Sequence, residues 1–550
     1  MITTVKLFCL GLMTGIVLGL QAAPSPSRTA EADCKYEISI RFDPNQNKLS
    51  GEVKVIHPSD SVFVLAKTLN VISVKAGGKN VPFTTSANSS LSNEYSVSSK
   101  PETLVINYSG QIRQEDFPKT ISNLNMLSPD LIELSDHIDW YPKMKIYSQP
   151  VFHLSVNLPE NFDVVTNCNF ISETKTGERK ISVWESDENV YSLTLLAAPE
   201  FKKSVLSENG STIEIYYKDL PATYIDSMKA DLMKTWDFYK NLYGVNGAND
   251  ELRIVYSPRT AGGYARAPLI VVSENYALEQ FASANGFARD FRLNAHEMAH
   301  YWSKAATSTS EDWINEGLAE FSALLASERF IGKNFSQLLV DEYKGMVYTT
   351  QTDVSVLETK SDSWERDINR YYKPTLLLND LKEKYGDNQL DEFFSLLYKK
   401  FEEAKAANTG LFMEALKETY GTVEADSFLK ALSEKNWVKE TKRTAVADLD
   451  TAIIGTWTGK LSQFGTTTLF VLNIKIAGSE VVATLDSPDQ NAFDIPVSEF
   501  GFIDDTIFFR VGVASASYSG KLNRVDQTIT GIWKQRDAGY SLDISRQNKK

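Results

Sequence analysis

The period of the hydrophobic pattern changes twice along the chain, and these changes constrain the fold more than any other feature of the sequence. Over 34–205, apolar and polar residues alternate in short runs, as they do from Tyr36 to Phe42, which predicts β-strands. Over 281–437 the apolar residues recur at helical spacing, and beyond 452 the strand pattern returns with Gly, Asp and Asn at the turns. Because 550 residues exceed what one core holds, we expect a multidomain α+β chain.

The borders between these patterns predict the domain organisation. We expect an antiparallel β-sandwich first, then an α+β domain that begins with strands and continues as helices, and finally an all-β, barrel-like domain. The predicted segments are a signal peptide at 1–22, a linker at 23–33, the sandwich at 34–205, the α+β domain at 206–440 and the barrel-like domain at 450–547.

The first residues are typical of an export signal. Lys6 is followed by an apolar run from Leu7 to Leu20 and then by small residues around Ala22. The run is shorter than the roughly 20 residues that a spanning helix needs, so a membrane anchor is the less favoured alternative. We therefore expect export to the periplasm or the extracellular space, with no stable membrane insertion after the signal is removed.

Two cysteines, Cys34 and Cys168, remain once this signal is removed. Export permits a disulfide between them, but two cysteines give no pattern that decides the matter. The formal net charge of -14 argues against nucleic acid and against anionic membrane surfaces as partners.

The segment His296-Glu297-Met298-Ala299-His300 lies in one of the helical stretches. Residues four apart share a helix face, so both imidazoles can reach one metal ion. Glu297 would then face the position of a metal-bound water, where a carboxylate serves as general base. The alternative is a pair of surface histidines that bind nothing.

A zinc site in a hydrolase has three protein ligands and one open position, so a third ligand must come from elsewhere. The next predicted helix carries Glu316 and Glu320, again four residues apart. If this helix packs against the first, one carboxylate can bind one Zn2+ per chain. The other can accept the outer N–H of a ligand histidine. The spacing alone leaves open which carboxylate does which.

The order of these motifs, HExxH and then a helix with Asn315-Glu316-Gly317, resembles the gluzincin metallopeptidases. The likeness is to the aminopeptidase N branch, which holds alanyl aminopeptidases and leukotriene hydrolases. It covers about 36–432 and implies a thermolysin-like zinc catalytic domain, with Glu316 as the third ligand and Glu320 as the support of a histidine. Only fifteen residues, Tyr301–Asn315, precede Glu316 after the zinc motif, fewer than the family usually has.

The resemblance also implies a tyrosine over the metal, in a Tyr-x-Lys stretch that opens a helix. Matching on Lys373 makes Tyr371 this residue, and a phenol there would hydrogen-bond the oxyanion of the reaction. Tyr372 is the alternative if the register differs by one.

A third family motif is degenerate in this chain. Where the family has Gly-Ala-Met-Glu-Asn as a substrate-binding stretch, this sequence has Gly262-Gly263-Tyr264-Ala265-Arg266. By the resemblance, Ala265 replaces the glutamate that binds the free α-amine of a substrate, and Arg266 adds a positive charge beside it.

Three acids of the first domain offer an alternative anchor for the amine, unless they are ordinary surface residues. They are Glu133, Asp136 and Asp139.

These observations lead to one function and several alternatives. We expect a secreted zinc metallopeptidase that acts on peptides or proteins but lacks the usual anchor for a free N-terminus. The alternatives are a true aminopeptidase anchored from the first domain, a non-peptide hydrolase with the same zinc site, and a binding protein with a vestigial metal site. The presence of Glu297 argues against a vestigial site, because a metal site that only stabilises the fold would not need a general base.

Overall fold

The computed structural model describes residues 34–547 apart from short internal segments, so the predicted signal peptide and linker lie outside the described residues. The internal positions left out are 59, 99–100, 117–125, 145–149, 187–189, 191, 245–250, 260–261, 282–284, 304–308, 350–351, 361–364, 438–450, 464–465, 478–479, 504, 512–513, 515 and 536–537.

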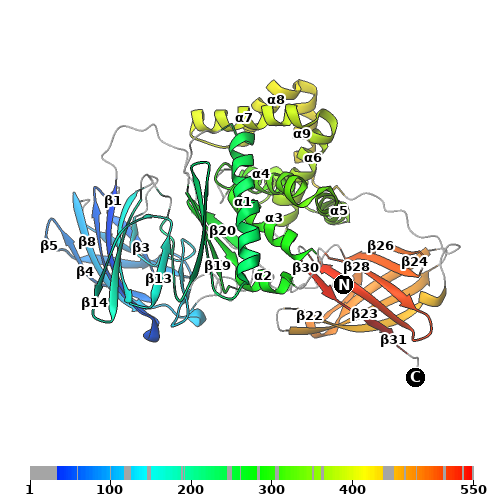
Figure 1. Ribbon diagram of the computed structural model, residues 1–550, viewed down its shortest axis with the longest axis horizontal. Helices are drawn as coiled ribbons and strands as arrows, with labels where there is room; N and C mark the ends of the chain where they lie inside the picture. Colours follow the sequence, from blue (N-terminus) through cyan, green and yellow to red (C-terminus); the bar gives the residue numbers. More distant parts are fainter. Residues whose placement is uncertain are drawn as a thin grey trace. The chain divides into compact units, whose positions relative to one another are not determined.

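The chain forms two compact units (Figure 1). The N-terminal unit holds the described residues of 13–234 and 247–276, and the C-terminal unit holds those of 235–246 and 277–550. The predicted domain boundaries stay a prediction. In the described part of the chain, no helix is long and apolar enough to cross a membrane.

In its described residues, the N-terminal unit begins with sixteen strands in three sheets. They are β1 (Lys35–Asp43), β2 (Lys48–Ile56), β3 (Val62–Ala66), β4 (Leu69–Ala76), β5 (Lys79–Asn80), β6 (Phe83–Ala87), β7 (Ser92–Val97), β8 (Thr103–Gln111), β9 (Met126–Leu127), β10 (Ile132–Leu134), β11 (Lys143–Met144), β12 (Val151–Pro159), β13 (Phe162–Thr166), β14 (Asn169–Thr176), β15 (Arg179–Glu185) and β16 (Leu195–Pro199), with short 3-10 helices at Pro44–Gln46 and Gln114–Asp116.

The largest of these sheets has eight strands in the order β14-β15-β12-β1-β2-β8-β4-β5. Two four-stranded sheets, β13-β16-β10-β9 and β11-β3-β7-β6, accompany it. Along β1 the residues Tyr36, Ile38, Ile40 and Phe42 are buried while their neighbours are more exposed, as the alternating sequence predicts. One continuous core joins side chains of all three sheets, which is the packing of a sandwich.

Among the described strands of the sandwich, one pair departs from the antiparallel pattern expected from the sequence. β1 pairs in parallel with β12, with Lys35 opposite Val151. The two strands are separated by more than a hundred residues of chain, so the long return that a parallel pair requires is available.

A smaller mixed sheet completes the N-terminal unit, in the order β17-β18-β19-β21-β20. Tyr264, Leu269 and Val271 of this sheet share a core with Val165 and Leu196 of the sandwich. The elements are β17 (Lys202–Glu208), β18 (Ser211–Tyr217), β19 (Glu251–Ser257), β20 (Gly263–Arg266) and β21 (Leu269–Ser273), and α1 (Ala222–Leu242) and α2 (Glu274–Phe281) run from this unit into the next.

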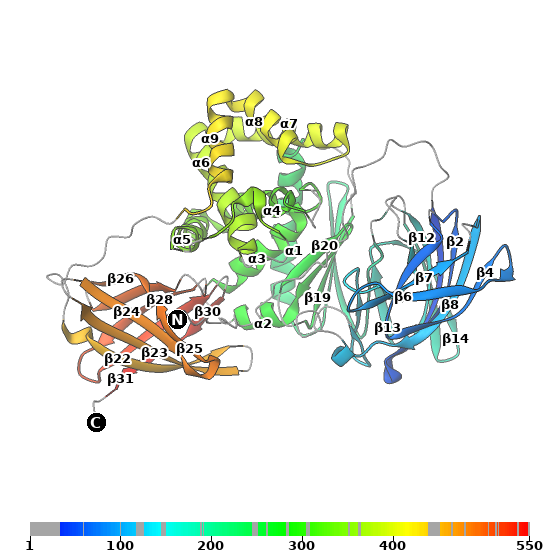
Figure 2. The same cartoon turned by 180° about the vertical axis from the view of Figure 1, so that it is seen from behind.

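The C-terminal unit begins with helices (Figure 2). They are α3 (Gly286–Ala299), α4 (Asp312–Ala326), α5 (Lys333–Thr349), α6 (Lys373–Tyr385), α7 (Asp387–Ala404), α8 (Thr409–Tyr420) and α9 (Thr422–Ser433), with π-helical turns η3 (Ser327–Ile331) and η5 (Asp367–Tyr372) and a 3-10 helix η4 (Val356–Glu358). Every residue of α4 is buried, because other helices surround it.

The last part of the same unit is an all-β half-barrel, which agrees with the barrel-like domain expected from the sequence. The sheet order is β25-β24-β23-β22-β31-β29-β28-β27-β26, with β30 paired to β29, so β25 and β26 form the two edges. Trp457 and Trp533 lie in its core. The strands are β22 (Gly455–Gln463), β23 (Thr466–Ala477), β24 (Glu480–Ser487), β25 (Ala492–Pro496), β26 (Ser498–Ile503), β27 (Thr506–Val511), β28 (Ala516–Asn523), β29 (Thr528–Gln535), β30 (Ala538–Ser541) and β31 (Ile544–Arg546), with 3-10 turns at Thr451–Ile453 and Pro488–Gln490.

Candidate metal centre

Helix α3 carries the first two residues of the candidate site and positions the third. His296 and Glu297 lie in its last turn, and each is 5% exposed. His300 follows the helix directly and keeps a helical backbone, with φ -61° and ψ -9°. Its imidazole therefore stays one turn from that of His296, and the ring centroids are 4.9 Å apart.

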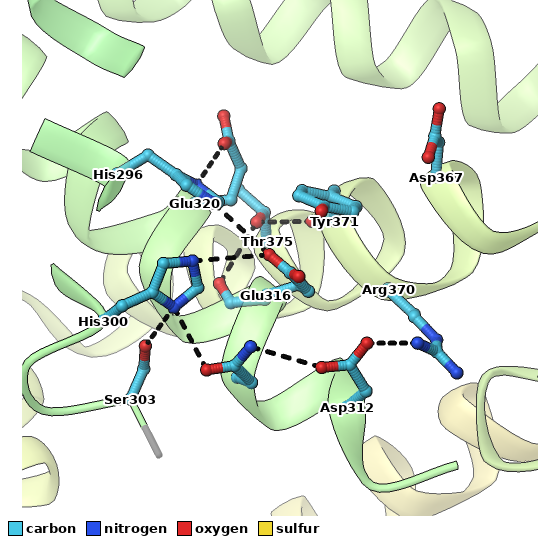
Figure 3. A network of polar contacts seen from close by, with 12 residues as sticks. His296, His300, Ser303, Asp312, Glu316, Glu320, Asp367, Arg370, Tyr371 and Thr375 are labelled. Atoms are coloured by element: carbon cyan, nitrogen blue, oxygen red, sulfur yellow. Dashed lines mark hydrogen bonds and ion pairs between the residues drawn. The ribbon is translucent and has the colours of Figure 1, made fainter. Parts of the chain in front are cut away.

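Helix α4 packs beside α3 and brings a carboxylate to both histidines (Figure 3). Glu316 Oε2 lies 3.3 Å from His296 Nε2 and 3.6 Å from His300 Nε2. One ligand atom from each of the three residues lies within 4.8 Å of the other two.

The geometry of this cluster fits a zinc ion. Bonds of about 2.0–2.1 Å around a tetrahedral ion place neighbouring ligand atoms about 3.3 Å apart. The distances from Glu316 to the two histidines are close to this value. Two imidazole nitrogens and one carboxylate oxygen are also the donor set of a catalytic zinc site, which leaves a fourth position for water or substrate.

Oxygen atoms lie close to the outer nitrogens of both histidines. His296 Nδ1 lies 2.9 Å from Glu320 Oε2, while His300 Nδ1 lies 3.1 Å from Asn315 Oδ1 and 3.3 Å from Ser303 Oγ. When Nδ1 carries the proton, Nε2 presents its lone pair to the metal.

Arginines pair with two of the acids near the cluster. Arg292, one turn before His296, donates to both oxygens of Glu320 at 2.6 Å, and Tyr343 also donates to Glu320. Asn315 donates to Asp312, which in turn is paired with Arg370 (Figure 3). Sequence reasoning missed these partners, although the spacing of Arg292 from the zinc motif could have indicated it.

Helix α4 approaches the segment of Tyr371 closely because residue 317 is glycine. A Cβ at Gly317 would lie 2.7 Å from Pro374 Cβ and 3.2 Å from the carbonyl oxygen of Arg370. A larger residue at position 317 would push α4 away from this segment.

The segment before α6 is a π-helical turn, and Pro374 follows it at the start of α6. Proline has no N–H to donate to the carbonyl of Arg370, four residues earlier. Within the turn, the amide of Lys373 bonds to the carbonyl of Ile368, five residues back. This wider turn contains Tyr371.

The two tyrosines of this turn have different neighbours. The ring of Tyr371 stacks on the imidazole of His296, with centroids 5.6 Å apart and planes at 18°. Tyr372 stacks on Tyr343 at 4.8 Å. The structure thus places Tyr371, and not Tyr372, against a candidate ligand.

Electrostatics at the cluster favour a bound cation. Burial would lower the pKa of His296, but Glu316, Glu320 and the charge of Glu297 outweigh burial and raise it to about 10 in the metal-free protein. Burial opposes the ionised form of Glu316, yet His296, His300 and Arg366 hold its pKa at about 2. The carboxylates therefore stay ionised. Burial also raises the pKa of Tyr371 well above its usual value, so its phenol stays protonated.

The five residues predicted to bind substrate belong to the N-terminal unit, and their role stays a prediction. Gly262 precedes β20 with φ +71°, a conformation that glycine adopts easily. Gly263, Tyr264, Ala265 and Arg266 form β20.

Arg266 is not the unbalanced positive charge that the sequence suggests. It forms a two-pronged ion pair with Asp136, through Nη2 at 2.7 Å and 3.0 Å, and the guanidinium also lies over the ring of Tyr264. The pair is formed between residues 130 positions apart, so the local sequence gave no sign of it.

The three acids proposed as an alternative anchor are already paired. Glu133 is 1% exposed and accepts hydrogen bonds from Ser257 at 2.5 Å and from Tyr264 at 3.2 Å, with Arg259 Nη1 at 3.5 Å. Burial raises the pKa of Glu133, while these partners lower it. Asp136 binds Arg266, and an oxygen of Asp139 lies 3.5 Å from Lys143 Nζ.

The lowered pKa of His137, which lies next to Asp136, predicts that acid destabilises the N-terminal unit. Burial, reinforced by nearby cations such as Arg266, lowers the pKa of His137 to about 4, against about 6.5 when unfolded. Its contribution to stability is full above pH 6.5 and is lost as the pH falls toward 4. Between pH 7 and pH 4.5, the free energy of unfolding should fall by about 2 kcal/mol less in His137→Gln than in the wild type. Denaturant unfolding at both pH values measures this, with His153→Gln as control; an unchanged pH dependence in His137→Gln would refute it.

Comparison with known proteins identifies the fold. No protein-family model matches the chain. A protein of Sulfurisphaera tokodaii described as "Probable aminopeptidase 2" is 24% identical over 310 residues, which is 52% of this chain but only 38% of that protein. The match thus spans well under half of the curated relative.

Solved structures match over more of the chain. The M1 zinc metallopeptidase of Deinococcus radiodurans superposes with a TM-score of 0.57 at 17% identity, covering 74% of this chain and 94% of that one. A mutant of the same enzyme bound to a Tyr-Ser-Ala substrate superposes with a TM-score of 0.58 at 16% identity, covering 74% of this chain and 95% of that one.

Legionella pneumophila aminopeptidase A in complex with aspartic acid gives a TM-score of 0.57 at 14% identity, covering 84% of this chain and 57% of that one. At these identities the likeness concerns the fold. The arrangement expected from the motifs is confirmed at that level: the chain has the fold of the M1 zinc metallopeptidases, the aminopeptidase N family.

Proposed function

We propose that this protein is an exported zinc peptidase that hydrolyses peptide bonds of peptides or proteins. The observation that carries the proposal is the cluster of His296, His300 and Glu316, whose ligand atoms all lie within 4.8 Å of one another, with acceptor oxygens close to the outer nitrogens of both histidines. The fold and the relatives named as aminopeptidases support the same reaction class. Export is proposed from the apolar N-terminal run alone.

The residues around the cluster have distinct parts in the proposed reaction. When bound, zinc would polarise the scissile carbonyl and lower the pKa of a water molecule. Glu297 would take up the proton of that water and pass it to the leaving amine. The protonated phenol of Tyr371 would donate a hydrogen bond to the developing negative charge. Glu320 would hold His296 in place.

The decisive experiment measures metal and activity together. The purified protein should contain one zinc per chain, and it should cleave members of a mixed peptide library. A chelator should abolish cleavage, and added zinc should restore it. Zinc binding without cleavage of any peptide would favour a non-peptide hydrolase or a binding protein with a vestigial site.

We further propose that cleavage does not require a free N-terminus. A substrate ammonium buried without a carboxylate partner is costly. Ala265 offers no carboxylate, and the acids Glu133, Asp136 and Asp139 already have partners in the N-terminal unit.

Paired peptides, identical except for N-acetylation, test this proposal. Acetylation is expected to change kcat/KM by less than about tenfold, which corresponds to roughly 1.4 kcal/mol. A loss of about a thousandfold would establish an amine anchor and make simple aminopeptidase activity the better description. Asp136→Asn and Glu133→Gln would then show which acid supplies it.

A further inference from the structure

Arg366 contacts two parts of the candidate site at once. This residue directly precedes the π-helical turn and is 9% exposed. Its Nη2 donates to Glu316 Oε1 at 3.3 Å, and its guanidinium lies 5.4 Å from the centroid of the Tyr371 ring. A buried guanidinium needs such compensation, because burying a charge without a partner is unfavourable.

The two carboxylate oxygens of Glu316 have different contacts. Oε2 faces the Nε2 atoms of both histidines, whereas Oε1 is held by Arg366. A charged hydrogen bond on one oxygen fixes the plane of a carboxylate. Glu316 can then offer a metal a single oxygen, and the fourth position stays open for water or substrate.

The contact with Tyr371 acts on the other side of the site. The ring of Tyr371 stacks on His296 and also lies under the guanidinium of Arg366. A planar guanidinium is suited to this contact, and a lysine ammonium at the same place would lack its flat face.

We propose that Arg366 is a positioning residue that keeps Glu316 a one-oxygen ligand and holds Tyr371 against His296. This inference rests on the proposed zinc site. The guanidinium acts through Glu316 and Tyr371, so its loss changes metal binding and turnover and leaves KM nearly unchanged.

The test compares Arg366→Met and Arg366→Lys with a matched control. Arg289 is also buried on a helix of this unit and is paired with Glu342 at 2.7 Å, but it contacts no candidate ligand through that pair, so Arg289→Met reports the general cost of removing such a residue. Zinc affinity is measured by competition with a chelator, and the visible spectrum of the Co2+-loaded protein reports the coordination number.

Arg366→Met is expected to weaken zinc binding about 10–100-fold. It should also weaken the intense visible bands of four-coordinate Co2+, because Glu316 can now bind through both oxygens. Arg366→Lys should restore most of the zinc affinity, since a cation again faces Glu316, but less of kcat, since Tyr371 has lost the planar contact. Arg289→Met should retain the affinity and spectrum of the wild type.

Two results would overturn the inference. The first is a folded Arg366 variant in which zinc affinity, the Co2+ spectrum and kcat are all those of the wild type. The other is an equal loss of zinc in Arg289→Met, which would mean that fold stability alone sets metal binding. A wild-type protein that binds no zinc would instead refute the proposed function and, with it, this inference.

Discussion

Glu297→Gln is expected to keep its zinc and to lose about a hundredfold to ten-thousandfold of its peptidase turnover. Glutamine has nearly the same shape as glutamate, so the helix that carries His296 and His300 should be undisturbed. The amide cannot accept a proton, and Glu297 is the residue of the zinc motif assigned to that step. Single-turnover rates on a good library peptide, with zinc content measured on the same sample, give the result.

Glu316→Ala supplies the contrast. It removes a candidate ligand, so both zinc and activity should be lost. Full zinc occupancy in Glu316→Ala would show that the third ligand has been misassigned, and Glu320, 2.9 Å from His296, would be the first alternative to examine. Normal turnover in Glu297→Gln would exclude Glu297 as the general base, whatever the metal content.

Tyr371→Phe is expected to lower kcat by about two to three orders of magnitude, the usual loss when one oxyanion donor is removed. The phenol stays protonated, because burial raises its pKa, and can therefore donate throughout the working range of pH. The phenyl ring preserves the stacking on His296, so the substitution removes the donor and little else. Steady-state kinetics should show the loss in kcat rather than in KM.

Tyr372→Phe is the matched control, one residue along the same turn. Tyr372 stacks on Tyr343, so losing its hydroxyl should leave kcat within a fewfold of wild type. The opposite result, an inactive Tyr372→Phe beside a normal Tyr371→Phe, would mean that the phenol acting in catalysis is one residue further along.

The sequence predicted the parts of this protein that depend on local spacing. The alternation from Tyr36 to Phe42 produced β1, and the helical period produced α3 and α4. The four-residue spacing of His296 and His300 is itself a statement about one helix face, so it could be interpreted without the structure. The family resemblance then supplied what spacing left open, the preference for Glu316 over Glu320.

Partnerships between distant segments could not be predicted. Nothing in the sequence around Arg266 indicates that Asp136, 130 residues earlier, is its partner. Arg366 likewise lies fifty residues after Glu316, and the hydrogen bond between them exists because α4 and the π-helical turn pack together at Gly317. The neighbours of Tyr371 were also decided by packing, since its ring stacks on His296.

The sequence by itself therefore indicated the strand or helix character of the described segments and the zinc motif, and it predicts that Ala265 replaces the family's glutamate. The tertiary structure alone decided which charges balance one another, and so which side chains remain available to a metal or a substrate. The physical reason is that periodicity fixes the direction of a side chain relative to its own helix or strand. Its neighbours across the core depend on the packing of surfaces contributed by residues far apart in the chain.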